Sequence, residues 1–320
     1  MEAEAVGALP ATRTLIKVVE VWVPNADRTC LELSSGIYGE ADRFGTASRT
    51  HRFRFGEELP GRVWAGGRPL ILNDLSDATF RRRQSAQAAG LSSVIALPIL
   101  LGEFVSAVMV LFCGADGGEV GAIELWNAPA GEHDMSLIDG YYGATDDAFE
   151  FASRKTVFRQ GVGLPGITWQ TDRPQFIEDL GSSRQFVRAE SARRAGIHRG
   201  LAIPCPTDGG DFYVMTFLSS LATPIARRVE YWLPDASRSN LSRVEGFCEV
   251  RGRLSPTISV PRAQGVLGSV WSTGVPRISE NAAAEFAESG SEVEAAGLTS
   301  LVAIPLVRGG ALAGVVAWYF

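Results

Sequence analysis

The sequence predicts an α+β protein of three tandem domains, each a mostly antiparallel sheet with helices packed on it. Three blocks of residues recur in the same order along the 320-residue chain and predict this class. The first block is a Glu-x-Trp strand, the second is a Gly-x-x-Trp segment, and the third is an apolar run that contains a proline. The landmarks of the three blocks are Trp22, Trp126 and Trp232, then Trp64, Trp169 and Trp271, then Pro98, Pro204 and Pro305. A repeat of this length is a small domain rather than a solenoid unit, so we expect domains at 1–116, 117–222 and 223–320.

The first half of each domain is predicted to hold two strands and a short helix, as the first domain illustrates. Residues 15–23 alternate valines with Glu20 and Trp22, and a Pro-Asn-Ala-Asp turn separates them from a second strand at 29–37. An irregular stretch rich in Gly, Ser, Thr and Arg follows. A proline then begins a short helix over 59–66, which a glycine pair ends.

The second half is predicted to hold a short strand, a helix and a hairpin. Residues 69–74 have the pattern of a strand, and Asp77 is in position to cap a helix over 78–89. Apolar runs at 93–101 and 104–113 flank a Gly-Glu turn. These two runs together approach the length of a membrane span, but a proline and the turn interrupt them. We therefore predict a buried hairpin and no membrane segment.

Charge and composition exclude several classes of function. The net charge of −6 and the pI near 5.3 argue against a nucleic acid as partner, because such proteins normally carry a basic patch. The run Arg81-Arg82-Arg83 has no evident counterpart in the other domains, and we interpret it as a solvated helix face. The N-terminus lacks the apolar core of a signal peptide, so a cytoplasmic protein is predicted.

The cysteines and histidines show no pattern of metal or redox chemistry. Cys30, Cys113, Cys205 and Cys248 fall at unrelated points of the repeat, and the three histidines do not recur in register. Each cysteine is therefore expected to be a small buried residue of a reduced protein. No metal site is predicted, and no cofactor can be named from the sequence.

The recurring motifs resemble the GAF domain, in particular the subclass found in bacterial sensor kinases and cyclases. The first two domains share Leu-Pro-Gly-x-x-Trp, a proline five residues later, an Asp-Leu pair, and then Ala-Gly-Leu/Ile followed by Ala-Leu/Ile-Pro. The third copy lacks the Leu-Pro and has Asn281-Ala282 in place of Asp-Leu. The resemblance implies a ligand pocket between the sheet and the helices of each domain.

The junctions between domains depart from the GAF pattern, since they are too short for the usual connecting helices. Two arrangements are open. In one, which we favour, compact GAF-like cores pack directly on each other. In the other, the opening strands of the second and third domains pair with the closing strand of the preceding domain.

Six side chains are predicted to line the pockets that the resemblance implies. The ligand-binding candidates are Trp64, Asp74 and Phe80 in the first domain and Trp169, Asp179 and Phe186 in the second. Each has a structural alternative: the tryptophans pack on the sheet, the aspartates cap the following turn, and the phenylalanines fill the interior. The carboxylates of the Glu-x-Trp blocks, Glu20, Glu124 and Glu230, either anchor a ligand or lie at an exposed or capped edge, and we expect the edge.

The sequence favours a non-catalytic sensory or regulatory protein over an enzyme. No Ser-His-Asp order, His-Glu-x-x-His motif or phosphate loop is present. We expect the domains to bind an unidentified small molecule or a partner protein and to signal by rearrangement; assembly into a homo-oligomer is left open. One alternative is an interaction scaffold whose pockets are filled by side chains. A less favoured one is a thiol enzyme like the methionine sulfoxide reductases, which requires Cys30 and Cys113 to meet.

Overall fold

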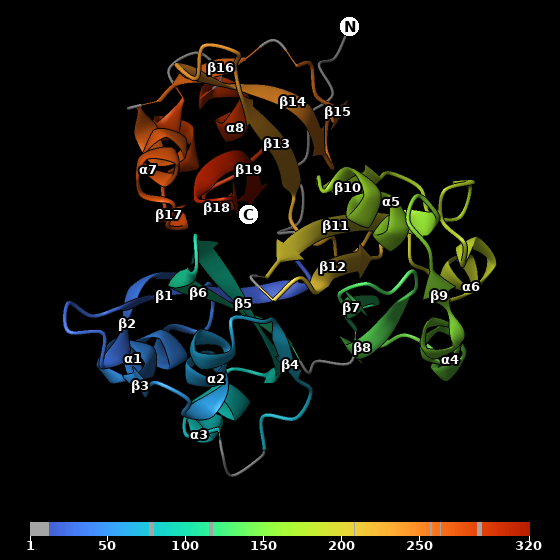
Figure 1. Ribbon diagram of the computed structural model, residues 1–320, viewed down its shortest axis with the longest axis horizontal. Helices are drawn as coiled ribbons and strands as arrows, with labels where there is room; N and C mark the ends of the chain where they lie inside the picture. The colour runs from blue at the N-terminus through green and yellow to red at the C-terminus, as the bar shows by residue number, and fades with distance from the viewer. Residues whose placement is uncertain are drawn as a thin grey trace, which may run out of the picture.

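The computed structural model describes residues 13–76, 80–114, 118–207, 209–256, 258–262, 264–286 and 290–320. These residues form three antiparallel sheets with helices packed on one face of each sheet, which confirms the predicted α+β class (Figure 1). Each sheet lies within one of the three sequence ranges given above, and we refer to them as domains 1, 2 and 3. In the described part of the chain no helix is long and apolar enough to cross a membrane.

Domain 1 is a six-stranded sheet in the order β3-β2-β1-β6-β5-β4, with three helices. Its elements are β1 (Ile16–Pro24), β2 (Cys30–Ile37), α1 (Asp42–Thr50), β3 (Phe53–Arg54), α2 (Glu58–Gly66), β4 (Leu70–Leu72), α3 (Arg83–Ala88), β5 (Leu91–Leu101) and β6 (Phe104–Gly114). The predicted strands and the short helix therefore lie within one or two residues of their expected limits. The predicted helix over 78–89 is shorter than expected, and Asp77 lies outside the described residues.

Domain 2 has the same strand order, β9-β8-β7-β12-β11-β10. Its elements are β7 (Gly121–Ala128), β8 (Met135–Tyr141), α4 (Asp147–Lys155), β9 (Val157–Phe158), α5 (Gly163–Thr171), β10 (Gln175–Ile177), α6 (Ala189–Arg194), β11 (Arg199–Pro206) and β12 (Phe212–Ser219).

Domain 3 repeats the order once more as β15-β14-β13-β19-β18-β17, with β16 added beside β14. Its elements are β13 (Arg228–Pro234), β14 (Asn240–Cys248), β15 (Gly252–Arg253), β16 (Ser259–Pro261), α7 (Gly265–Thr273), β17 (Arg277–Ser279), the 3-10 helix η1 (Ala282–Glu285), α8 (Gly290–Ala295), β18 (Leu301–Arg308) and β19 (Ala311–Tyr319).

Helices α1 and α4 occupy the stretch that we predicted to be irregular. Each is nine residues long and buries one phenylalanine with a serine four residues later, Phe44 with Ser48 and Phe149 with Ser153. Asp146 caps α4 by accepting a hydrogen bond from the Phe149 amide at 2.9 Å. Packing of a single aromatic residue, rather than a long amphipathic pattern, therefore fixes these helices.

The opening strand of each domain pairs with the closing strand of the same domain. β1 pairs with β6, β7 with β12, and β13 with β19, all antiparallel. Each domain therefore completes its own sheet and packs directly on its neighbours. Among the described residues, no opening strand pairs with the closing strand of the preceding domain.

The glycines of the Gly-x-x-Trp segments lie inside helices α2, α5 and α7. A Cβ on Gly61 in α2 would lie 2.2 Å from the Arg54 carbonyl oxygen of β3, and one on Gly166 in α5 would lie 2.1 Å from that of Arg159. Only glycine lets the helix approach the neighbouring backbone so closely.

The described chain contains four apolar cores, whereas the repeat predicts three. Each domain has its own core between sheet and helices, built on Trp22, Trp126 or Trp232. The opposite faces of all three sheets meet in a fourth core at the centre of the molecule (Figure 1). Equivalent residues from β5, β11 and β18 line a small central void there: Leu97 to Leu100, Ile203 to Cys205, and Ile304 to Val307.

The three domains are arranged in a closed ring around this shared core. The edge strand that follows the tryptophan helix in each domain contacts the second strand of the next: β4 contacts β8, and β17 contacts β2. Between β10 and β14 the contact is made by Phe176 and Phe247, whose ring centroids lie 5.2 Å apart. Each domain therefore has one neighbour on either side.

Candidate functional site

The interior of domain 1, where the GAF resemblance places a ligand, contains a fully buried carboxylate. Glu20 accepts hydrogen bonds from the Trp22 indole at 2.9 Å and from the Tyr38 hydroxyl at 3.2 Å. The Arg82 guanidinium donates to its two oxygens at 2.7 and 3.0 Å. The expectation of an exposed or capped edge for this glutamate was wrong, because an arginine and two aromatic donors compensate its burial.

Domain 2 repeats the arrangement around Glu124. Its carboxylate accepts from the Trp126 indole at 3.1 Å, from Tyr142 at 3.2 Å and from two nitrogens of Arg188 at 2.6 and 2.8 Å. Burial disfavours the charged form, but the charge and hydrogen bonds of Arg188, together with a bond from Thr216, outweigh it and lower the Glu124 pKa.

The two arginines fill the interior that a ligand would otherwise occupy. Arg82 is 4% exposed and lies 4.7 to 5.7 Å from the centres of five aromatic rings, which belong to Trp22, Phe44, Phe53, Phe80 and Phe112. Arg188 is 5% exposed and lies over Trp126, Phe149, Phe158 and Phe186. The solvated helix face predicted for the arginine run was therefore wrong for Arg82, which is held by cation–π contacts and an ion pair.

Domain 3 also pairs its buried glutamate with arginines, but these come from different positions of the domain. Glu230 accepts from the Trp232 indole at 3.1 Å, but its cations are Arg228 and Arg243, which come from β13 and β14 at 2.5 and 2.6 Å. Tyr319 of β19 donates to it at 2.6 Å. A buried glutamate with an arginine partner is thus common to all three domains, and it serves the fold in each.

The predicted aspartates lie in surface turns. Asp74 accepts a hydrogen bond from the Ser76 amide at 2.8 Å, and Asp179 accepts from the Gly181 amide at 3.0 Å and from the Ser182 hydroxyl at 2.7 Å. The Ser182 bond and the turn amides lower the pKa of Asp179. Both aspartates follow the turn-capping alternative rather than facing a pocket.

The predicted aromatic residues divide between the cores and one cleft. Phe80 and Phe186 are 2% and 3% exposed and cover the buried arginines. Trp169 is half-buried against the core of domain 2. Trp64 lines a sizeable cavity.

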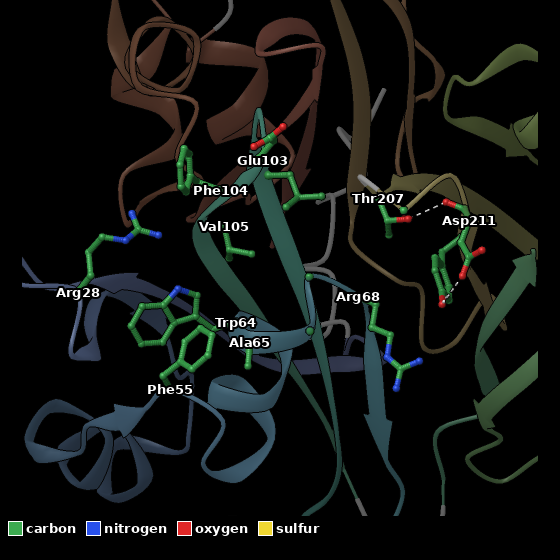
Figure 2. A pocket seen from close by; sticks show the side chains of 15 residues that line it. Arg28, Phe55, Trp64, Ala65, Arg68, Glu103, Phe104, Val105, Thr207 and Asp211 are labelled. Carbon is green, nitrogen blue, oxygen red and sulfur yellow. Dashed lines mark hydrogen bonds between the residues drawn. The ribbon is translucent and has the colours of Figure 1, made fainter. Parts of the chain in front are cut away.

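This cavity is a cleft of about 450 Å³ between domains 1 and 2 (Figure 2). Its domain 1 wall comes from α2, the loop that follows it, and the tip of the β5–β6 hairpin; its domain 2 wall comes from the β11–β12 hairpin. The lining residues are Arg28, Phe55, Trp64, Ala65, Gly66, Gly67, Arg68, Leu100, Glu103, Phe104, Val105, Thr207, Gly209, Asp211 and Tyr213. We refer to it as the interdomain cleft. Its size falls in the range of small-molecule sites, roughly 300 to 1,000 Å³.

The ring arrangement explains why this interface is open. Two of the three interfaces are closed by residues at equivalent positions. One residue of each pair lies three positions after Pro98 or Pro305, and the other lies three positions after Trp271 or Trp169 in a neighbouring domain. Leu101 packs on Gly274, and Arg308 forms an ion pair with Asp172 at 2.5 Å. The third pair is Thr207 and Gly67, both of which line the cleft. A short side chain facing glycine leaves unfilled the space that leucine or an Arg–Asp pair occupies elsewhere.

The cleft walls combine exposed aromatic rings with charged groups. Phe55 and Phe104 are 61% and 65% exposed. The Phe55 ring lies edge-on to Trp64 at 5.1 Å, and the Arg28 guanidinium lies 5.5 Å from the centre of the Phe104 ring. Exposed rings gathered around a concavity are typical of binding sites.

A second hollow in domain 1 is larger, at about 740 Å³, but has mainly polar and charged walls. It is lined by Thr29, Cys30, Arg52, Arg54, Glu57 and Arg81. Two of its arginines are engaged in ion pairs, Arg52 with Glu32 at 2.9 Å and Arg81 with Glu57 at 3.6 Å. Without apolar walls it is a weaker candidate than the interdomain cleft.

The thiols are separated by the strand register. Cys113 lies opposite Ile16 at the start of β1, whereas Cys30 lies opposite Asn25, just beyond the other end of β1. Nine strand residues span about 30 Å, so the two thiols do not approach each other. Burial raises the pKa of Cys113 to about 12, which keeps it protonated. Among the described residues no cluster of His, Cys, Asp or Glu has the composition of a metal site.

Sequence reasoning missed the buried arginines, although a signal was present. Phe80-x-Arg82 and Phe186-x-Arg188 have the same pattern and lie 106 residues apart, the same spacing as Trp126 and Trp232. The cleft residues other than Trp64 carry no such signal, because the cleft depends on a contact between two domains.

A family model described as the GAF domain matches residues 18–125, from β1 into β7. The match covers domain 1, so this part of the chain belongs to the GAF domain family. The match supports a sensory or regulatory domain in general. A comparison with curated proteins gave no match.

Several solved structures are similar to part of the chain. A GAF domain of A. aeolicus Nlh2 in an inactive state shares 18% identity over 31% of this chain and 58% of its own, with a TM-score of 0.26. A GAF domain/HD domain protein from Geobacter sulfurreducens shares 16% over 32% and 65%, with a TM-score of 0.27. A free methionine-R-sulfoxide reductase from Neisseria meningitidis shares 12% over 32% and 53%, with a TM-score of 0.24. In each case less than two thirds of the other protein is covered, and we base no functional argument on these similarities.

Proposed function

We propose that this chain is a non-catalytic regulatory protein that binds a small molecule in the interdomain cleft and signals by a change in the packing of domain 2 against domain 1. The observation that supports this most is the contrast between the filled interiors of domains 1 and 2 and the open, aromatic-lined cleft between them. A molecule in the cleft contacts both domains at once.

The physical basis is a difference in affinity between two arrangements of the ring. A ligand shifts a conformational equilibrium only to the extent that it binds one state more tightly. In the cleft, the β11–β12 hairpin provides one wall and α2 with its loop provides the other, so contact with both walls favours the closed arrangement. Residues of either domain alone offer a ligand less surface.

Native mass spectrometry of protein purified from its own host tests this proposal. Thr207→Arg places on the cleft wall the side chain that Arg308 provides at the equivalent position, and it is expected to fill the cleft. The wild type is expected to retain a small molecule that the variant loses. Thr207→Val, which keeps the size of the residue, is the matched control and is expected to retain it.

Hydrogen exchange provides the second measurement. Addition of the retained molecule is expected to slow exchange in the β11–β12 hairpin and in α2 of the wild type, but not of Thr207→Arg. A molecule retained equally by all three proteins, or none retained by any, would count against the cleft as the functional site.

The second candidate function is an interaction scaffold without a ligand, and the self-filled interiors favour it. Arg82 and Arg188 occupy the position where the family resemblance places a ligand. In that case the protein acts through its surface on a partner, and neither cleft variant is expected to change its behaviour.

A further inference from the structure

We infer that the interdomain cleft selects a planar aromatic molecule that carries a carboxylate, with Arg68 as its anion-binding residue. This inference rests on the proposed function and narrows the class of ligand. It follows from the apolar walls, from the balance of charge among the lining groups, and from the comparison with the closed interface between domains 2 and 3.

The apolar part of the cleft suits a flat ring. Phe55, Trp64 and Phe104 come from three separate segments of domain 1 and gather on one side of the cleft (Figure 2). Two of these rings are more than half exposed, which leaves their faces or edges open to a ligand. Aromatic pairs prefer offset or edge-to-face contacts and gain about 0.5 to 1.5 kcal/mol beyond the area that they bury.

The charged groups of the cleft differ in whether they already have a hydrogen-bond or ion-pair partner. Asp211 already accepts from the Ala130 amide at 3.0 Å and from the Tyr213 hydroxyl at 3.5 Å. Glu103 lies at the tip of the β5–β6 hairpin, away from Arg68 in Figure 2. Among the described residues neither Arg28 nor Arg68 has an acidic partner within ion-pair distance, and Arg28 instead lies over Phe104.

Arg68 follows directly on Gly67, the position at which the three interfaces differ. At the interface between domains 2 and 3, the equivalent of Gly67 is Asp172, whose carboxylate pairs with Arg308. In the cleft a cation is present beside this position, but the acid is missing. A ligand carboxylate would provide it, and an arginine fork binds a carboxylate through two parallel hydrogen bonds.

Isothermal titration with three matched probes tests the inference: indole-3-acetate, tryptamine and 3-methylindole, which share one ring system and differ in charge. Indole-3-acetate is expected to bind at least about tenfold more tightly than the other two, a difference of about 1.4 kcal/mol. Arg68→Gln is expected to remove that advantage. Arg62→Gln, on the preceding helix α2 and not among the residues that line the cleft, is expected to change the affinity less than twofold.

The outcomes separate this inference from the proposed function. Binding of 3-methylindole or tryptamine as tight as that of indole-3-acetate, or an unchanged affinity in Arg68→Gln, would overturn the carboxylate class. If a probe bound in this way and Thr207→Arg abolished its binding, the cleft would remain a ligand site. Failure of all three probes to bind would also overturn the inference, and the mass-spectrometric comparison would then decide the proposed function by itself.

Discussion

The interior of domain 2, where the GAF resemblance places a ligand, and the interdomain cleft differ in what occupies them. In the interior, Arg188 lies among four aromatic rings and pairs with the buried Glu124. In the cleft, aromatic rings and an arginine are also present, but the centre is open. The interior has an occupant supplied by its own chain, and the cleft does not.

The difference shows that one arginine side chain is enough to fill the interior where the GAF resemblance places a ligand. Arg82 and Arg188 donate hydrogen bonds to the buried carboxylates and lie over the aromatic rings in the interiors of domains 1 and 2. In the function that we propose, the ligand binds instead at a surface that exists only when the domains are assembled. Substitutions in the interior and at the interface between domains 1 and 2 each test this comparison.

The largest effect is expected in the interior, from Arg188→Ala. This variant leaves Glu124 buried without its cation and opens a cavity among the rings, and loss of one partner of a buried pair costs about 3 to 5 kcal/mol. The free energy of unfolding from urea denaturation measures it. Arg193→Ala, on the exposed face of α6, is the control and is expected to change stability by less than about 0.5 kcal/mol. A loss below about 1 kcal/mol for Arg188→Ala would show that the interior tolerates an empty site.

A smaller effect is expected in the acid dependence of stability. The Glu124 pKa is lowered in the folded protein, so its contribution is fully present above the unfolded value near 4.5 and is lost as the pH falls through the folded pKa. Glu124→Gln is expected to flatten the stability profile below about pH 4.5, by at most about 1.4 kcal/mol per pH unit for one proton. Urea denaturation at a series of pH values measures the slope, and Glu190→Gln on the surface should leave it unchanged. A wild-type slope in Glu124→Gln would contradict the assignment.

The smallest effect is expected at the contact between β4 and β8, where Asn73 joins domains 1 and 2. Its amide donates to the Gly140 carbonyl at 3.0 Å and to the Asp139 carboxylate at 3.2 Å. Asn73→Ala is expected to cost about 1 kcal/mol and to speed hydrogen exchange in the β11–β12 hairpin. Asn73→Asp, which faces Asp139 with a second carboxylate, should cost more. Equal stability in all three proteins would mean that this interface is held by the shared core alone.

Much of the fold could be predicted because it is local and repeated three times. The alternating valines around Trp22, the glycine pair after Trp64 and the apolar runs beside Pro98 each specify one element from neighbouring residues. Helices α1 and α4 could not be predicted in this way, because each depends on one phenylalanine that packs against a sheet formed by distant segments.

The site was predictable only in part. Trp64 was identified by its repetition, and it lines the cleft. Asp74 and Asp179 instead accept hydrogen bonds from backbone amides of their own turns, a role that an aspartate takes in many surface turns. The cleft itself depends on Thr207 facing Gly67 across a domain boundary. Residues 140 positions apart in the chain give no periodic signal, so this contact requires the folded ring.

Because the three sheets share a core, we expect the domains to unfold more cooperatively than domains that are joined only by linkers. Each sheet contributes apolar side chains to the centre as well as to its own helices, including Met109, Met215 and Val316, all at most 1% exposed. Excision of one domain would expose the inner sheet faces of the other two and remove its part of the common core. The three domains are therefore expected to unfold together in one cooperative transition.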